Sequence, residues 1–255
     1  MRRPGHVSCW ASGVSRPTTA LALALTGLVV LSVQRLSGAS TPASCSCPET
    51  VALDRLFNSI ERPLVAYQAL RRLEAASAKL SESAWMDAFT QYDPAIGFRY
   101  RILGQGGSNR IFNQVLKPVL EAERENAIQS ERRKGAINRE NYDFNVDGHT
   151  ADGLIKVTLN PRRRDSRLVQ GVALLSPQSG DLVRLQGRLS RSPSFWVRWV
   201  DITRRYTRIR GAMLPVAVES VANVKIAGVS TFSMRYEYVM VDGQNLAPPQ
   251  ILASR

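Results

Sequence analysis

The segment Ser230-Thr231-Phe232-Ser233-Met234-Arg235-Tyr236-Glu237-Tyr238-Val239 decides the fold. Large apolar side chains occupy every second position, and polar side chains occupy the positions between them. Such alternation places one face of a β-strand against apolar groups and the other against water. The segment therefore predicts a strand in a sheet with one covered face.

The same period-two pattern recurs from residue 140 onwards, between turn signals such as Asp147-Gly148 and Asn160-Pro161. The predicted strands are Tyr142–Val146, Leu154–Leu159, Leu168–Leu175, Leu182–Leu189, Phe195–Ile209, Leu214–Ile226 and Ser230–Val241, with an earlier strand over Gly97–Leu103. No helical stripe separates the later strands, and parallel pairing needs a long crossover connection. We therefore expect one antiparallel sheet.

The N-terminal part of the chain has a helical pattern instead. Apolar residues recur at helical spacing from Glu49 to Tyr92, with an interruption at Pro63. A second helix is predicted over 108–134, where Ser108 is a candidate cap and Pro118 marks a kink or a new start. A large sheet with one apolar face must cover that face. We expect an α+β fold, with a strongly curved antiparallel sheet, an unclosed half-barrel, and N-terminal and inserted helices over its concave face.

Residues 1–39 have the features of a signal peptide. Arginines precede the apolar run 20–31, and small residues follow it at 37–39. The run is shorter than the roughly 20 residues that span a bilayer, which favours cleavage over a permanent anchor. We expect residues 40–48 to form a flexible linker, residues 49–255 to form a single domain, and the exported protein to reside in the periplasm.

Cys45 and Cys47 lie in the linker and allow three interpretations. Cys45 is a candidate for lipid modification, because small residues precede it. A metal pair lacks partners, because zinc takes four ligands. Two inert thiols or a disulfide in a flexible arm are the third interpretation.

The charge favours anionic partners. The chain has a net charge of +13, and removal of the four arginines in 1–39, where no acid occurs, leaves +9. Such a field attracts lipid headgroups, anionic membrane surfaces and acidic polymers. Because export separates the protein from nucleic acid, we expect no nucleic-acid partner.

No catalytic constellation is recognisable. His149 lies in a polar, turn-like stretch, where a single histidine is more often a solvated loop residue than a base, and neither a Gly-x-Ser-x-Gly nor a His-Glu-x-x-His motif occurs. Gly104-Gln105-Gly106-Gly107 precedes a helix, but a turn with an N-cap explains it better than a phosphate-binding loop. We expect a binding protein without enzymatic activity, cofactor or metal.

Two further stretches carry a resemblance to a known family. They are Gly187-Arg188-Leu189 through Ser194-Phe195-Trp196-Val197-Arg198-Trp199-Val200-Asp201, and Arg208-Ile209-Arg210-Gly211-Ala212-Met213-Leu214-Pro215-Val216. With the strand rhythm over 95–245, they resemble the LolA-like superfamily of periplasmic lipoprotein carriers. The resemblance implies an unclosed β-barrel, helices that plug its mouth, and a cavity that accepts acyl chains.

We therefore expect the protein to bind, and to carry, an acyl-chain ligand such as a lipid or the lipid anchor of a lipoprotein. The predicted apolar lining is Phe144, Leu174, Leu185, Trp199, Phe232, Met234, Tyr236 and Tyr238. Arg204, Arg208 and Arg210 alternate along one strand and are the candidates for the anionic end of the ligand. The alternative is an envelope scaffold or stress-signal regulator that grips a protein partner through the same fold. The oligomeric state stays open.

Overall fold

The computed structural model describes residues 48–60, 65–127 and 133–246. The predicted signal peptide and all but the last residue of the predicted linker lie outside these ranges, as do Cys45 and Cys47. Within them, no helix combines the length and the apolar character needed to cross a bilayer.

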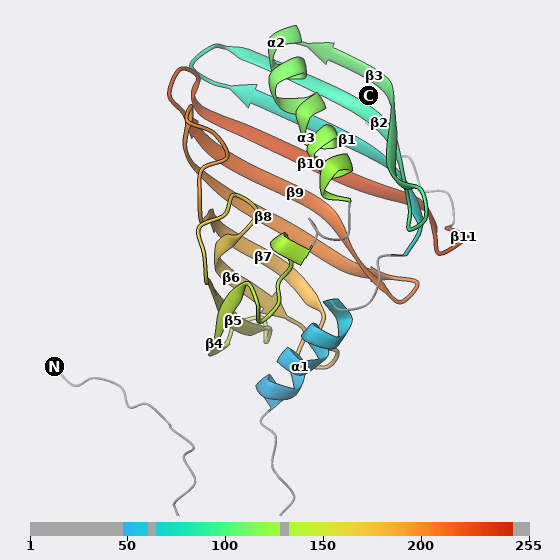
Figure 1. The fold of residues 1–255 in the computed structure, drawn as a ribbon, viewed down its shortest axis with the longest axis vertical. Coiled ribbons are helices and arrows are strands. Elements are labelled where there is room, and N and C mark those ends of the chain that lie inside the picture. Colours follow the sequence, from blue (N-terminus) through green and yellow to red (C-terminus); the bar gives the residue numbers. More distant parts are fainter. Residues whose placement is uncertain (1–47, 61–64, 128–132, 247–255) are drawn as a thin grey trace, which may run out of the picture. The chain divides into compact units, whose positions relative to one another are not determined.

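One antiparallel sheet dominates the fold (Figure 1). Its strands are β1 (Tyr67–Ser77), β2 (Glu82–Asp93), β3 (Gly97–Gly107), β4 (Tyr142–His149), β5 (Ile155–Pro161), β6 (Val169–Leu175), β7 (Leu182–Leu189), β8 (Val197–Ile209), β9 (Ala212–Val224), β10 (Gly228–Val241) and β11 (Gln244–Asn245). The order is β3-β2-β1-β10-β9-β8-β7-β6-β5-β4, with β11 on β10. Because β3 and β4 end the order at opposite edges, the sheet is an unclosed half-barrel, as predicted.

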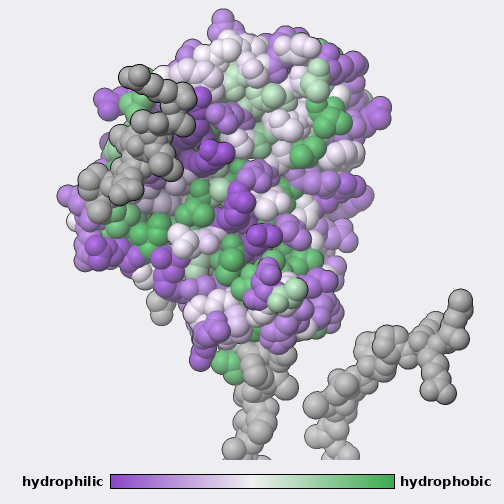
Figure 2. Space-filling view, turned by 180° about the vertical axis from the view of Figure 1, so that it is seen from behind, coloured by the Kyte–Doolittle hydropathy of each residue, from purple (hydrophilic) through white to green (hydrophobic). Residues whose placement is uncertain are grey.

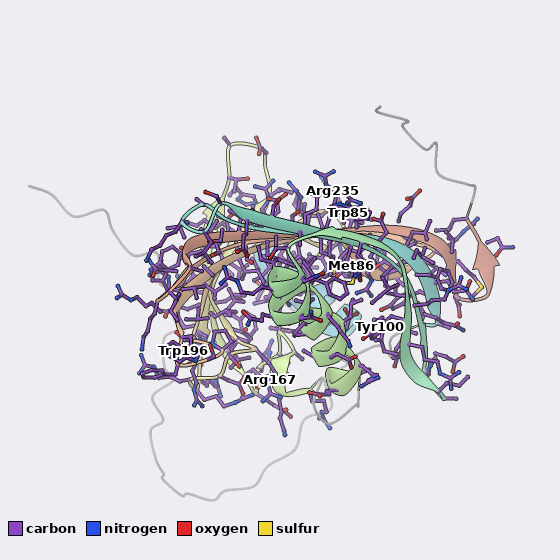
Figure 3. The ribbon with its side chains drawn as sticks, turned by 90° about the horizontal axis from the view of Figure 1, so that it is seen from above. Trp85, Met86, Tyr100, Arg167, Trp196 and Arg235 are labelled. Carbon is purple, nitrogen blue, oxygen red and sulfur yellow. The ribbon has the colours of Figure 1, made fainter. Side chains whose placement is uncertain are left out.

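The helices lie on the concave side of the sheet (Figure 3). They are α1 (Pro48–Ile60), α2 (Asn109–Ile111), the π-helical segment η1 (Phe112–Leu116) and α3 (Lys117–Asn126). The Ser108 hydroxyl accepts a hydrogen bond from the Ile111 amide, which confirms the predicted cap. Pro118 lies where the π-helical segment η1 passes into α3, and the backbone stays helical through this junction. The structure therefore has a change of helix type near Pro118 and no separate second helix within residues 109–126.

The helical prediction for 67–92 is wrong, because β1 and β2 occupy most of that range. Burial in β1 alternates strictly, with Tyr67, Ala69, Arg71, Leu73 and Ala75 inward. Two small alanines and an arginine on the buried face weaken the apolar signal of that alternation. The pairing of β1 with β10 supplies the missing stabilisation, and no local pattern reports a partner that lies so far away in the chain.

Two apolar clusters cover different parts of the concave face. The first core lies under η1 and α3, on the inward side of β1, β2, β9 and β10, and includes Leu73, Met86, Leu116 and Leu120. The second core lies between α1 and strands β4–β7, and includes Leu56, Ile155, Leu159 and Leu175. Ile202 on β8 contacts both clusters. The strands between the two cores therefore form the centre of the concave face.

The outer face of the sheet is polar, with apolar patches between hydrophilic side chains (Figure 2). Arginines on this face pair with acids on neighbouring strands. The pairs are Arg72–Asp87, Arg188–Asp201 and Arg205–Glu219. Their half-exposed geometry indicates a solvated surface and little net stabilisation from each pair.

Candidate functional site

A strip of half-buried apolar side chains crosses the centre of the concave face. We call it the concave strip, and it comprises Leu189, Val200, Ile202, Ala222 and Phe232. The strand register brings these inward positions together across β7, β8, β9 and β10. Because the helices pack chiefly on β1–β3 and on β6, the concave strip keeps part of its apolar surface exposed. Such a surface is suited to an apolar ligand.

Arg204 lies beside the concave strip. It points inward from β8, and its register partners on the two neighbouring strands are the buried residues Leu185 and Val218. The titratable groups that act on it are the phenols of Tyr206, Tyr236 and Tyr142. Burial opposes the charge, but the phenol oxygens favour it, and the pKa of Arg204 stays above its usual value.

No carboxylate pairs with Arg204 among residues 48–60, 65–127 and 133–246. A cation that is partly withdrawn from water costs free energy unless an anion or several hydrogen bonds compensate for it. Arg204 is therefore the group on this face that is best placed to receive an anion from outside the chain.

A second arginine on this face already has its anion. The side chain of Arg71 is completely buried and contacts both carboxylate oxygens of Glu123 on α3, at 2.5 and 2.9 Å. It also donates to the Tyr67 hydroxyl at 3.0 Å, and its Cζ lies 4.4 Å from the centre of the Tyr236 ring. Tyr236 thus neighbours both the compensated Arg71 and the uncompensated Arg204.

Three tyrosines of this region, Tyr67, Tyr236 and Tyr238, stay neutral at ordinary pH. Burial, followed by the charge of Glu123, raises the pKa of Tyr67 and Tyr236 above the usual phenol range. Burial also raises the pKa of Tyr238, whose hydroxyl donates to the Pro215 carbonyl at 2.8 Å. These side chains can therefore supply hydrogen bonds and apolar ring faces to a ligand, with no negative charge to repel an anion.

The structure brings six of the eight predicted lining residues to the concave face. Four of them lie on the inward face of β10: Phe232, Met234, Tyr236 and Tyr238. Two of these, Met234 and Tyr238, are buried in the first core itself. Leu185 is buried in the second core. Phe144 is half-buried against the same core and meets Phe57 of α1 edge to face, with ring centres 4.9 Å apart. Phe232 and Tyr236 are the aromatic residues best placed to meet a ligand.

Leu174 and Trp199 lie on the other side of the sheet, so their assignment to the concave lining is wrong. Leu174 pairs with Lys156 and Arg184, on the face opposite Ala173 of the second core. Trp199 lies under the outer-face Arg188, whose Cζ is 4.9 Å from its ring. An irregular register between Val197 and Trp199 makes the phase of this segment hard to predict.

The three predicted arginines separate as well. Arg208 is exposed and forms an ion pair with Asp181, and Arg210 is an exposed residue with positive φ in the turn between β8 and β9. A register shift after Arg205 breaks the alternation that would place both arginines beside Arg204. Arg204 alone keeps the position expected for the anionic end of a ligand.

Sequence reasoning missed the Arg71–Glu123 pair. The signal was the alternation Tyr67, Ala69, Arg71, Leu73, Ala75, which a helical interpretation of 49–92 concealed. A strand interpretation would have placed Arg71 on a buried face, where an acidic partner is needed.

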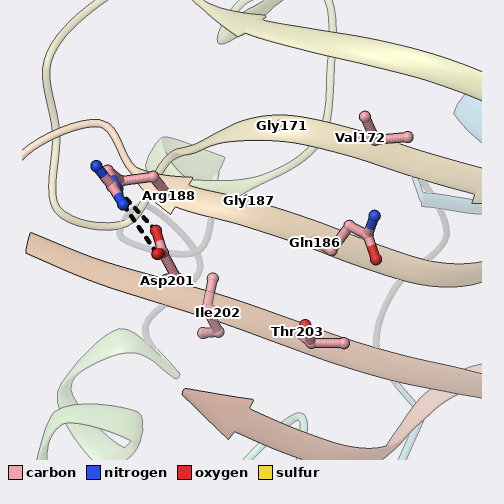
Figure 4. Close-up of a pocket in the computed structure, with 8 residues that line it drawn as sticks. All are labelled: Gly171, Val172, Gln186, Gly187, Arg188, Asp201, Ile202 and Thr203. Carbon is pink, nitrogen blue, oxygen red and sulfur yellow. Dashed lines mark hydrogen bonds and ion pairs between the residues drawn. The ribbon is translucent and has the colours of Figure 1, made fainter. Parts of the chain in front are cut away.

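Two shallow depressions, both lined chiefly by outer-face side chains, are distinct from the concave strip. One of about 590 Å³ follows β6, β7 and β8 and includes the Arg188–Asp201 pair (Figure 4). Gly171 and Gly187 oppose each other there, and a Cβ on Gly171 would lie 2.1 Å from the Gln186 carbonyl oxygen. The other, of about 610 Å³, lies beside Trp85 and Glu219. Neither corresponds to the apolar cavity expected on the concave side.

The fold and the site define a class of protein: an antiparallel half-barrel with helices on its concave side and an arginine beside apolar inner-face residues. No protein-family model matches the chain, and no curated protein matches it. Among solved structures, the chain is similar to a DUF1329 family protein from Desulfovibrio piger. The two are 8% identical, the match covers 74% of this chain and 91% of the other, and the TM-score is 0.34.

Proposed function

We propose that this protein binds an anionic amphiphile, with its acyl chain on the concave strip and its charged head at Arg204. The observation that carries the proposal is an arginine on the apolar inner face that has no carboxylate partner in the part of the chain that the structure describes. Each buried CH₂ of an acyl chain contributes about 0.8 kcal/mol. The concave strip therefore supplies affinity, and Arg204 supplies selectivity for the head group.

The resemblance to the LolA-like superfamily supports the same proposal. The ligand would be a lipid or the lipid anchor of a lipoprotein, and the signal-like residues 1–39 would export the protein to the periplasm. The protein would act by binding and releasing its ligand, without catalysing a reaction.

The experiment compares two ligands with the same chain and different heads. A fluorescent fatty acid bound to the purified protein is displaced by oleate or by uncharged oleyl alcohol. We expect oleate to bind at least about 30-fold more tightly, because a buried charge pair is worth roughly 2 kcal/mol or more. The variant Arg204→Gln should lose this preference and retain the affinity for oleyl alcohol.

Arg205→Gln is the matched control, because Arg205 is the next residue on the same strand and pairs with Glu219 on the outer face. It should preserve the preference for oleate. Urea unfolding of each variant verifies that the sheet is intact. Equal affinities for the two ligands in the unmodified protein, or an unchanged preference in Arg204→Gln, would refute the proposal. Met234→Asp is unsuited to this purpose, because it would place a carboxylate inside the first core.

A further inference from the structure

Apolar side chains stand exposed at one end of the sheet. Phe195 and Trp196, in the loop between β7 and β8, are 78% and 55% exposed, and Ile226, in the turn between β9 and β10, is 60% exposed. The two aromatic rings meet edge to face with centres 5.6 Å apart. Neither the fold nor the concave site requires these side chains to face solvent.

Direct contacts join three turns into one surface at this end. The Lys225 amide donates to the Trp196 carbonyl at 2.8 Å, and the Lys225 Nζ lies 3.2 Å from the centre of the Phe195 ring. The Ser77 hydroxyl donates to the Ala227 carbonyl at 2.8 Å, so the β1–β2 turn adjoins the β9–β10 turn. We call this surface the aromatic rim, made of residues 77–81, 190–198 and 223–230.

The aromatic rim is positively charged without compensation. Its exposed cations are Lys79, Arg191, Arg198 and Lys225, and its three segments contain no acidic residue. The arginines on the outer face of the sheet differ, because Arg72, Arg188 and Arg205 each have an acidic partner. The rim therefore combines exposed apolar groups with unneutralised positive charge.

We propose that the aromatic rim docks the protein on an anionic lipid bilayer. Tryptophan is enriched at the membrane–water interface, where its ring meets both apolar and polar groups. Lysine and arginine beside such a surface are attracted to anionic headgroups. The absence of acidic residues from the rim segments complements a negatively charged bilayer, and the apolar side chains supply insertion.

The position of the rim suits this role. Trp196 lies at one end of the half-barrel, level with the helices on its concave side (Figure 3). A bilayer docked there would lie beside the open face of the sheet. The inference goes beyond the proposed ligand binding and does not depend on it, because its residues are separate from Arg204 and the concave strip.

A position-specific label tests the docking. An environment-sensitive NBD dye is attached at Ile226→Cys in a full chain whose Cys9, Cys45 and Cys47 are replaced by Ser. Phosphatidylcholine vesicles with phosphatidylglycerol should shift the emission to the blue and increase it, whereas pure phosphatidylcholine vesicles should leave it unchanged. The label reports on the rim alone, whatever the apolar residues 20–31 do.

Ile96→Cys is the matched control, because Ile96 is 54% exposed in the β2–β3 turn at the opposite end of the sheet. Its label should not respond. An absent response at Ile226, an equal response without phosphatidylglycerol, or an equal response at Ile96 would each overturn the proposal. The first outcome would direct attention to an acidic protein partner.

Removal of positive charges from the aromatic rim tests whether electrostatic attraction contributes to docking. We expect Lys225→Gln with Arg198→Gln to weaken the response of the Ile226 label to phosphatidylglycerol vesicles by about 25-fold in apparent affinity, because each cation contributes roughly fivefold. Arg205→Gln on the outer face should leave that affinity unchanged. Equal effects of the two changes would show that net charge, and not the rim, determines binding.

Discussion

At the scale of single residues, Arg71 shows how one buried charge organises the concave face. Its side chain has no exposed surface, and Glu123 is its carboxylate partner. Burial disfavours the charge, but Glu123 outweighs that effect and raises the pKa of Arg71 above its usual value. A buried ion pair contributes little net stability, yet the loss of one partner leaves an uncompensated charge inside the protein.

We therefore expect Glu123→Gln to destabilise the protein by about 3–5 kcal/mol, as measured by urea unfolding. Replacing both partners, with Arg71→Met and Glu123→Met, should cost less than that single change. Asp87→Asn, which breaks the half-exposed pair with Arg72, should cost no more than about 1 kcal/mol. Similar losses for Glu123→Gln and Asp87→Asn would contradict the burial of Arg71.

At the scale of elements, the β5–β6 connection depends on Asp165. Arg167 donates to both oxygens of this carboxylate at 2.9 and 2.8 Å, and the Asp165 amide donates to the Ser190 hydroxyl at the end of β7. The hydrogen bonds from Arg167 lower the pKa of Asp165 from 3.8 to about 2, although burial opposes the shift. The ionised form is thus stabilised in the folded state.

Because the folded-state pKa lies below the unfolded value, this contribution is present above pH 3.8 and is lost as the pH falls towards about 2. We expect the unfolding free energy of the unmodified protein to fall across that window, and Asp165→Asn to reduce the slope. Chemical denaturation at several pH values measures the unfolding free energy and therefore this slope. Asp152→Asn, in the exposed β4–β5 turn, should retain the original slope. If Asp165→Asn leaves the dependence of the unfolding free energy on pH unaltered, the ionised Asp165 carboxylate does not stabilise the folded state.

At the scale of the whole molecule, β1 and β10 join the two parts of the sheet. β10 pairs with β1 on one side and with β9 on the other, so both strands lie well inside the sheet. β4 is an edge strand with several exposed side chains. Local opening requires less free energy at an edge than at a strand paired on both sides.

Hydrogen exchange followed by mass spectrometry should reflect this order. We expect peptides that cover Leu70–Leu73 and Phe232–Arg235 to exchange most slowly, because these residues are paired on both sides, and peptides within Tyr142–His149 to exchange much faster. Because Leu73 pairs with Met234, the two slow regions should lose protection together as denaturant is added. Fast exchange over Leu70–Leu73 would count against a central β1.

The concave site was only partly predictable from sequence. Alternation placed Phe232, Met234, Tyr236 and Tyr238 on one face, because a strand has a period of two whatever its neighbours are. It failed for Arg208, because a register irregularity after Arg205 shifts the phase and depends on how adjacent strands pair. The distinction between Arg204, without a carboxylate partner, and Arg208, paired with Asp181, required the positions of distant side chains.

The sequence by itself determined the antiparallel sheet from β3 onwards, the cap at Ser108 and the positive charge, because these follow from local periodicity, local hydrogen bonds and composition. Only the tertiary structure decided that 67–77 and 82–93 are strands, that Arg71 needs Glu123, and that three separate turns form the aromatic rim. The physical reason is that each depends on contacts between residues far apart in the chain. Such contacts supply free energy that no short segment contains.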